Sequence, residues 1–189
     1  GAYAEDEERV GINPVDTGRT ALESGAVYVY IRSNYIWTEQ AYIKASNTAQ
    51  SNEFGGVIDL SADGNTLVVG AVGESGISSG VDGDETQNAA TSGGSGAVYV
   101  FTRSGNAWGQ HSYLKASNSG KADLFGKSVS ISADASTIAV GAINESSSST
   151  GINSIETNND VEDSGAVYVF RKNISDKWQQ NVYIKASNT

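Results

Sequence analysis

Ser24-Gly25-Ala26-Val27-Tyr28-Val29 is a hexapeptide that returns unchanged at residues 95–100 and at residues 164–169. Successive copies begin 71 and 69 residues apart. An internal repeat of this length decides the architecture, because each copy marks one supersecondary unit that packs against its neighbours. The 189 residues therefore hold about 2.7 units of one kind instead of unrelated domains.

The residues between two hexapeptides predict four short strands per unit. Residues 54–60 and 67–71 are apolar runs joined by a segment in which Asp63-Gly64 predicts a hairpin turn. The hexapeptide begins a third strand, and the alternating residues 36–45 predict the fourth. Groups of four antiparallel strands at a period of about 70 residues are typical of β-propeller blades. A β-solenoid or a β-sandwich is the alternative.

We therefore expect an all-β chain that forms one partial propeller over residues 1–189. Its expected parts are a partial blade over residues 1–47, a blade over residues 48–118 and a blade over residues 119–189. Closed propellers typically have four to eight blades. The expectation is that further blades belong to a longer chain, or that copies self-associate to close a ring or extend a filament.

The fourth strand of each unit carries a recurring tryptophan and a recurring lysine. In residues 36–45 the period of two places Trp37 and Ile43 on one face and Tyr42 and Lys44 on the other. We expect the tryptophan face to be buried. Lys44 and its equivalents, Lys115 and Lys185, are expected to point outward, where exposed lysines discourage edge-to-edge pairing.

The composition is acidic and lacks cysteine. Twelve basic residues stand against 22 acidic ones, a net charge of −10, which argues against nucleic acid as a partner. The absence of cysteine excludes disulfides, thiolate metal sites and cysteine nucleophiles. No apolar run reaches the roughly 20 residues that span a bilayer, so no membrane insertion is expected.

Paired Phe-Gly and Gly-Ala dipeptides resemble the FG-GAP repeat. Phe54-Gly55 precedes Gly70-Ala71 at the same spacing at which Phe125-Gly126 precedes Gly141-Ala142. The resemblance implies the propeller of integrin α subunits and of many bacterial surface proteins, in the bacterial, long-loop form, and hence an extracellular or cell-surface location. The family's proline after Gly-Ala is replaced here by Tyr3, Val72 or Ile143. The hairpin turn has one carboxylate, so the family's calcium loop is not expected there.

Acidic residues gather in three long loops, residues 1–23, 73–95 and 143–163, which hold 15 of the 22 carboxylates. Aligned on Gly-Ala, the loops share an acid at Glu5, Glu74 and Glu145 and a later acid followed by threonine. Carboxylate and amide oxygens are the ligands of Ca²⁺, so calcium is a candidate cofactor. A solvated loop copied by duplication is the alternative reading. The candidate ligands are Glu5, Asp6, Asp82, Asp84, Glu85, Asp160 and Asp163.

The sequence offers little for catalysis. His111 is the sole histidine, it replaces Gln40 and Asn181 of the sister repeats, and it lies on a polar strand face. We expect a non-enzymatic extracellular module for binding, adhesion or assembly, with a protein or glycan ligand at the acidic loops. The alternatives are a structural subunit that assembles through open blade faces and a fragment of a propeller hydrolase.

Overall fold

All strands in residues 1–86 and 93–188, which this computed structural model describes, belong to antiparallel sheets. No helix long and apolar enough to cross a membrane occurs in that part of the chain. The first sheet has two strands and the other two have four each, paired in sequence order. The all-β prediction and the four-stranded blades are thus confirmed. The strands are β1 Val27–Ser33, β2 Ile36–Ile43, β3 Val57–Leu60, β4 Thr66–Ala71, β5 Ala97–Ser104, β6 Ala107–Leu114, β7 Phe125–Ile131, β8 Thr137–Ala142, β9 Ala166–Lys172 and β10 Trp178–Ile184.

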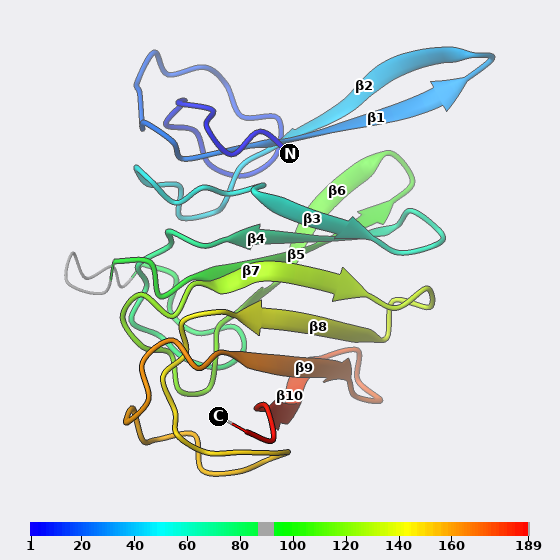
Figure 1. Ribbon diagram of the computed structural model, residues 1–189. Helices are drawn as coiled ribbons and strands as arrows, with labels where there is room; N and C mark the ends of the chain where they lie inside the picture. Colours follow the sequence, from blue (N-terminus) through cyan, green and yellow to red (C-terminus); the bar gives the residue numbers. More distant parts are fainter. Residues whose placement is uncertain (87–92, 189) are drawn as a thin grey trace.

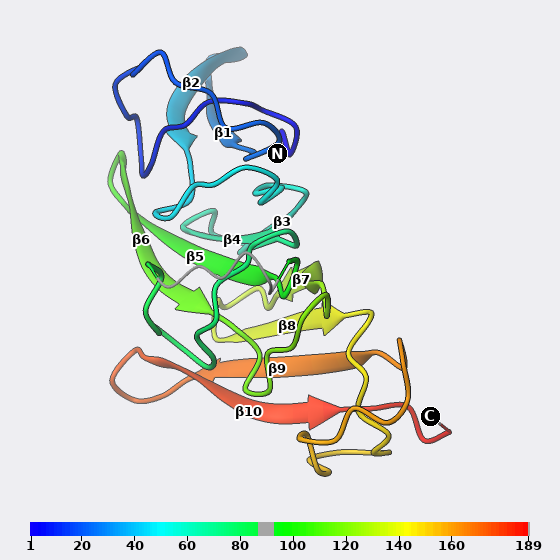
Figure 2. The ribbon, with the colours of Figure 1, turned by 90° about the vertical axis from the view of Figure 1, so that its left-hand side faces the viewer.

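The sheets are stacked face to face in chain order (Figures 1 and 2). The long loops gather on the left-hand side in Figure 1, whereas the tight hairpin turns lie on the right. Strands β3 and β4 of the middle sheet contact β7 of the next. Stacking buries apolar side chains from both sheet faces, as expected for strands with near-continuous hydrophobic runs. The described parts of the long loops share one side of the stack, which we call the loop side (Figure 1).

Aromatic residues of the inner strands build the core of each blade. Phe54 packs edge-on against Tyr99 and Phe101, with ring centroids 5.3 and 6.0 Å apart. Phe125 repeats this arrangement with Tyr168 and Phe170 at 5.4 and 6.1 Å. Edge-to-face pairs of this kind add to the free energy gained by burying the rings. The phenylalanine of each Phe-Gly pair is therefore an anchor of its own blade.

A β-bulge interrupts the outer strand at the same place in all three sheets. The pairing of β1 with β2 skips Gln40, that of β5 with β6 skips His111, and that of β9 with β10 skips Asn181. An extra residue turns the following side chains to the opposite face. The uninterrupted alternation predicted for residues 36–45 is therefore wrong beyond Gln40.

The recurring tryptophans pack against the preceding blade. Trp108 and Trp178 are 8% and 2% exposed, as predicted, and the Trp108 indole N–H donates to Gln40 Oε1 of the preceding sheet at 3.0 Å. Trp37 is 64% exposed, because no sheet among the described residues lies against that face of β1 and β2. The same side chain is thus buried or exposed according to whether a neighbouring blade covers it.

Candidate functional site on the loop side

The lysines that end the outer strands are buried, so the prediction that they point outward is wrong. The side chains of Lys44, Lys115 and Lys185 are 0% exposed. Each ammonium pairs with the glutamate that begins the long loop of its own repeat: Lys44 Nζ lies 2.6 Å from Glu5, Lys115 Nζ 2.8 Å from Glu74 and Lys185 Nζ 2.7 Å from Glu145. A buried charge of this kind persists only with a partner and hydrogen bonds.

The long loop itself covers the edge that the sequence suggested was open. The amide of Lys44 donates to the carbonyl of Gly11 at 2.8 Å, and the amide of Asn13 donates to the carbonyl of Tyr42 at 2.8 Å. Gly80 with Asp82, and Gly151 with Asn153, make the same bonds to the next two outer strands. The loop thus adds an isolated β-bridge to the outer edge of each sheet and encloses the lysine.

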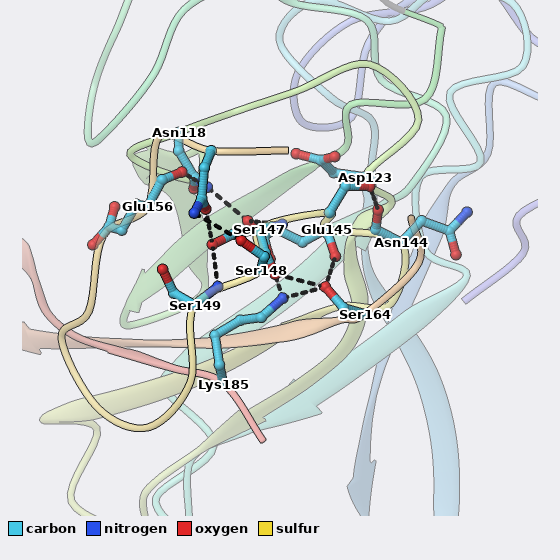
Figure 3. Close-up of polar contacts among 12 residues, drawn as sticks. Asn118, Asp123, Asn144, Glu145, Ser147, Ser148, Ser149, Glu156, Ser164 and Lys185 are labelled. Carbon is cyan, nitrogen blue, oxygen red and sulfur yellow. Dashed lines mark hydrogen bonds and ion pairs between the residues drawn. The ribbon is translucent and has the colours of Figure 1, made fainter. Parts of the chain in front are cut away.

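A serine completes each buried cluster, which we call the Glu–Lys–Ser cluster (Figure 3 shows Glu145, Lys185 and Ser164). In the middle blade, Lys115 Nζ donates to Ser95 Oγ at 2.7 Å. The Ser95 hydroxyl donates to the carbonyl oxygens of Glu74 and Gly76, each 3.2 Å from Oγ. A serine that donates to backbone carbonyls holds a loop in place, and its proton is not directed toward a base.

Burial dominates the electrostatics of the middle cluster. It lowers the pKa of Lys115, although the nearby carboxylate of Glu74 acts in the opposite direction. Burial also raises the pKa of Tyr113, helped by the charge of Glu74. The cluster therefore contains one ion pair beside a phenol that stays protonated. Desolvation of such pairs offsets much of their attraction, so their contribution is to fix geometry more than to add stability.

An asparagine joins each blade to the loop of the next. Asn118 Nδ2 donates to Glu145 Oε1 at 2.9 Å and to the Glu156 carbonyl at 2.7 Å (Figure 3). The Oδ1 of Asn118 accepts from the hydroxyl of Tyr168 at 2.6 Å. Asn47 makes the same three contacts with Glu74, Glu85 and Tyr99. We call the contact region between two successive blades a joint. Each joint shares one glutamate, Glu74 or Glu145, with a Glu–Lys–Ser cluster.

The candidate calcium ligands have separate positions. Glu5 is paired with Lys44, whereas Asp6 accepts from the amide of Glu23 at 2.9 Å. Asp82 accepts from the amide of Tyr113 at 3.0 Å and Asp84 from the amide of Thr86 at 2.9 Å. The remaining candidates interact with a side chain or lie exposed: Glu85 with Ser46 and Gln110, Asp160 with Ser148, and Asp163 exposed at a positive φ of 55°.

These positions do not bring the candidates into one coordination sphere. Among residues 1–86 and 93–188, no three histidine or acidic side chains are grouped so that they could hold a metal ion. Calcium binding by the loops stays a prediction.

His111 lies 3.2 Å from Asp176 and 3.0 Å from Ser112, at the bulge of the outer strand.

Among the buried carboxylates of the described residues, Asp123 has no basic partner within an ion-pair distance, whereas Glu74 and Glu145 are paired with lysines. Asp123 occupies the position of Asn52 in the preceding repeat, is 6% exposed, and accepts from the amide of Gly120 at 2.7 Å. Burial, with the charge of Glu145 nearby, raises the pKa of Asp123 to about 6. The ionised form is therefore penalised in the folded chain.

Replacing Asp123 by asparagine should stabilise the chain by about 1 to 2 kcal/mol at about pH 7.5. The unfolded carboxyl has a pKa of 3.8, so the folded chain loses stability as the pH rises from about 4 to about 6, and the penalty stays constant above. The gain should vanish near pH 4, which urea unfolding at both pH values measures. N52D is the matched control and should lose stability at the higher pH. An equal gain at both pH values would contradict this account.

Three contacts of this site were not anticipated from the sequence: the buried lysines, the serine of the hexapeptide and the joint asparagine. The sequence does contain a pattern that points to these contacts, because the residues involved recur together in every repeat. Each lysine follows its glutamate by 39, 41 or 40 residues, and each asparagine ends an Ala-Ser-Asn segment. Residues that recur together at fixed separations in every unit are candidates for mutual contact.

Comparison with protein families agrees with this geometry. The model of the FG-GAP repeat matches residues 37–101 and 108–170, which together make up more than half of the chain. Each match contains one Phe-Gly pair, the Gly-Ala pair that follows it by 16 residues, and one copy of the hexapeptide. No curated protein matches the chain. The two matches and the four-stranded sheets show that the chain belongs to the FG-GAP repeat family and is built of propeller blades.

Proposed function

We propose that this chain is a non-enzymatic, extracellular binding module that contacts a protein or glycan through its loop side. FG-GAP repeats occur in integrin-like propeller modules and typically in extracellular or surface proteins. The proposal rests on one observation: the Glu–Lys–Ser clusters fix the base of each long loop, while its outer part displays charged and apolar side chains. Fixed loops on a rigid scaffold lose little entropy when they bind.

The displayed side chains define what the loops can recognise. The long loops carry exposed carboxylates and also apolar side chains that are more than half exposed: Val10, Val15, Ile77, Ile152 and Ile155. Loops that present both kinds of side chain suit a partner that combines a basic patch with apolar contacts, as a protein surface does. A protein ligand is therefore favoured over a glycan.

A binding screen with charge-matched variants tests this proposal. The chain, immobilised by its end, is exposed to purified extracellular-matrix proteins and to a glycan array, with calcium and with a chelator. The D160N/D163N variant should weaken binding about fivefold or more at low salt, because loop charge is removed. The D63N/D134N variant removes the same charge from the hairpin turns and should bind normally. Equal effects of both variants, or no ligand in either panel, would count against the loop side.

Self-assembly is the second candidate function. The face of the first sheet presents aromatic side chains that are 40% to 64% exposed, namely Tyr28, Tyr30 and Trp37. Contiguous exposed apolar surface of this kind marks interaction sites in soluble proteins. Sedimentation velocity over a hundredfold range of concentration separates the two functions, because a binding module stays monomeric whereas an assembling subunit does not.

A further inference from the structure

The first joint, between the partial blade and the middle blade, is closed by a glutamine at the bulge of the outer strand. Gln40 Nε2 donates to Asn106 Oδ1 at 3.4 Å. Gln40 Oε1 accepts from the indole N–H of Trp108 at 3.0 Å and from Arg103 at 3.3 Å. The side chain is thus donor and acceptor at once, and it satisfies the indole of the following blade.

At the second joint, between the middle blade and the last blade, a histidine occupies the same place. His111 is the bulged residue of β6, and its Nε2 lies 3.2 Å from Asp176 Oδ2. Asp176 precedes Trp178 by two residues, as Asn106 precedes Trp108. The contact with the hairpin turn of the following blade is therefore kept. The other ring nitrogen, Nδ1, lies 3.0 Å from Oγ of the neighbouring Ser112.

The contact with the tryptophan is not made at the second joint. Trp178 is 2% exposed, and its Nε1 is buried with no hydrogen-bond partner among the described residues. A buried donor without an acceptor is destabilising, because it has lost its hydrogen bonds to water. In the first joint the bulged residue supplies this acceptor, so His111 is the residue placed to supply it here.

The charge on the imidazole decides whether His111 can accept. A neutral imidazole has one acceptor nitrogen, whereas the imidazolium has two donors and no acceptor. The charged groups that face the ring come from the last blade: Asp176 directly, and Lys172, whose Nζ lies 2.8 Å from Asp176 Oδ1. The hydrogen bond from Lys172 lowers the pKa of Asp176, which favours its ionised form. The residues around the bulge on β5 and β6 are uncharged: Val100, Phe101, Gln110 and Ser112.

We propose that His111 is a pH-sensitive switch at the second joint: its charged form pairs with Asp176, and its neutral form turns to accept from the indole N–H of Trp178. The first state is the contact that the structure shows. The second state reproduces the contact of Gln40 at the first joint and satisfies a buried donor. The joint therefore gains a buried hydrogen bond between two blades when His111 loses its proton. This device is independent of the loop-side function proposed above.

Nuclear magnetic resonance of the indole N–H groups tests the proposal, with W178F to identify the signal of Trp178. Between about pH 5 and about pH 8, this signal should move downfield in a one-proton transition. Its exchange with solvent, corrected for the intrinsic effect of pH, should slow about tenfold over the same range. The Trp108 signal should stay constant, because Gln40 does not titrate. A Trp178 signal that is constant over this range would overturn the proposal.

Two variants assign the transition to the switch. H111Q installs the side chain of the first joint, so its Trp178 signal should keep the high-pH position throughout. D176N removes the carboxylate that favours the charged imidazole, so its transition should move to lower pH. An unchanged Trp108 signal verifies that each variant is folded. A transition that persists in H111Q, or one that D176N leaves at the same pH, would overturn the proposal.

Discussion

About 3 to 5 kcal/mol of unfolding free energy should be lost in the K115A variant. Lys115 is fully buried, and its removal leaves Glu74, 1% exposed, without a counter-charge. An uncompensated charge in a dry site costs far more than the intact pair contributes. Since domains are typically stable by about 5 to 15 kcal/mol, urea unfolding should show a large shift of the midpoint.

The first blade provides the matched control. Glu5 is 14% exposed, so water can reach the carboxylate that K44A leaves behind. The loss in K44A should be smaller, about 1 to 2 kcal/mol. Equal losses in K44A and K115A would show that burial does not set the cost.

A double variant separates the charge from the geometry. In E74Q/K115M the glutamine keeps an oxygen to accept from the amide of Gly76, which donates to Glu74 Oε1 at 2.8 Å, while no charge is buried. This variant should be more stable than K115A, because a buried pair can be replaced by neutral groups at low cost. If E74Q/K115M were the less stable of the two, the buried charge would not be the cause of the loss in K115A.

The fold could be predicted from the sequence because the motifs that mark its strands recur at a regular spacing. The hexapeptide, the Phe-Gly and Gly-Ala pairs and the Asp63-Gly64 turn each mark a strand or its end, and their spacing groups the strands in fours. The bulge in the outer strand could not be predicted in this way. The bulged residues, Gln40, His111 and Asn181, share polarity but no backbone preference that a bulge requires.

The buried lysines were mispredicted for a related reason. A period of two assigns a lysine to the solvent face, and the pattern of one strand contains no information about what covers its edge. The cover comes from the long loop, through Gly11 and Asn13 and their equivalents. Recurring loop glutamates are compatible with metal binding, with a solvated loop copied by duplication and with ion pairing, because oxygen ligands and ion-pair partners are the same residue types.

The glycines of the hexapeptide explain why the family's two motifs both end or begin in glycine. A propeller of closely stacked sheets must bring backbones together where one blade ends and the next begins. At the second joint, the glycine of the hexapeptide, that of Gly-Ala and that of Phe-Gly are the points of contact: Gly96, Gly70 and Gly126. These glycines therefore recur because the backbones of two blades approach closely at each joint, and not because they bind a ligand.

The G96A variant should accordingly lose about 3 to 4 kcal/mol of unfolding free energy. Part of the loss, about 1 kcal/mol, comes from placing alanine at a φ of +84°. The rest comes from the Cβ, which would lie 2.6 Å from the nitrogen of Phe125 and force the two blades apart. Phe125 is 0% exposed, so its ring has no room to yield.

Two other glycines separate these contributions. Gly105, in the β5–β6 turn, and Gly165, in the third hexapeptide, have φ values of +61° and +74°, and a Cβ on either would meet no atom within 3 Å. G105A and G165A should each lose only about 1 kcal/mol, the backbone cost alone. The difference of about 2 to 3 kcal/mol from G96A, measured by urea unfolding, is the free energy of the close approach. If all three variants lost the same amount, backbone conformation would suffice to explain these glycines, and the joint would tolerate a side chain.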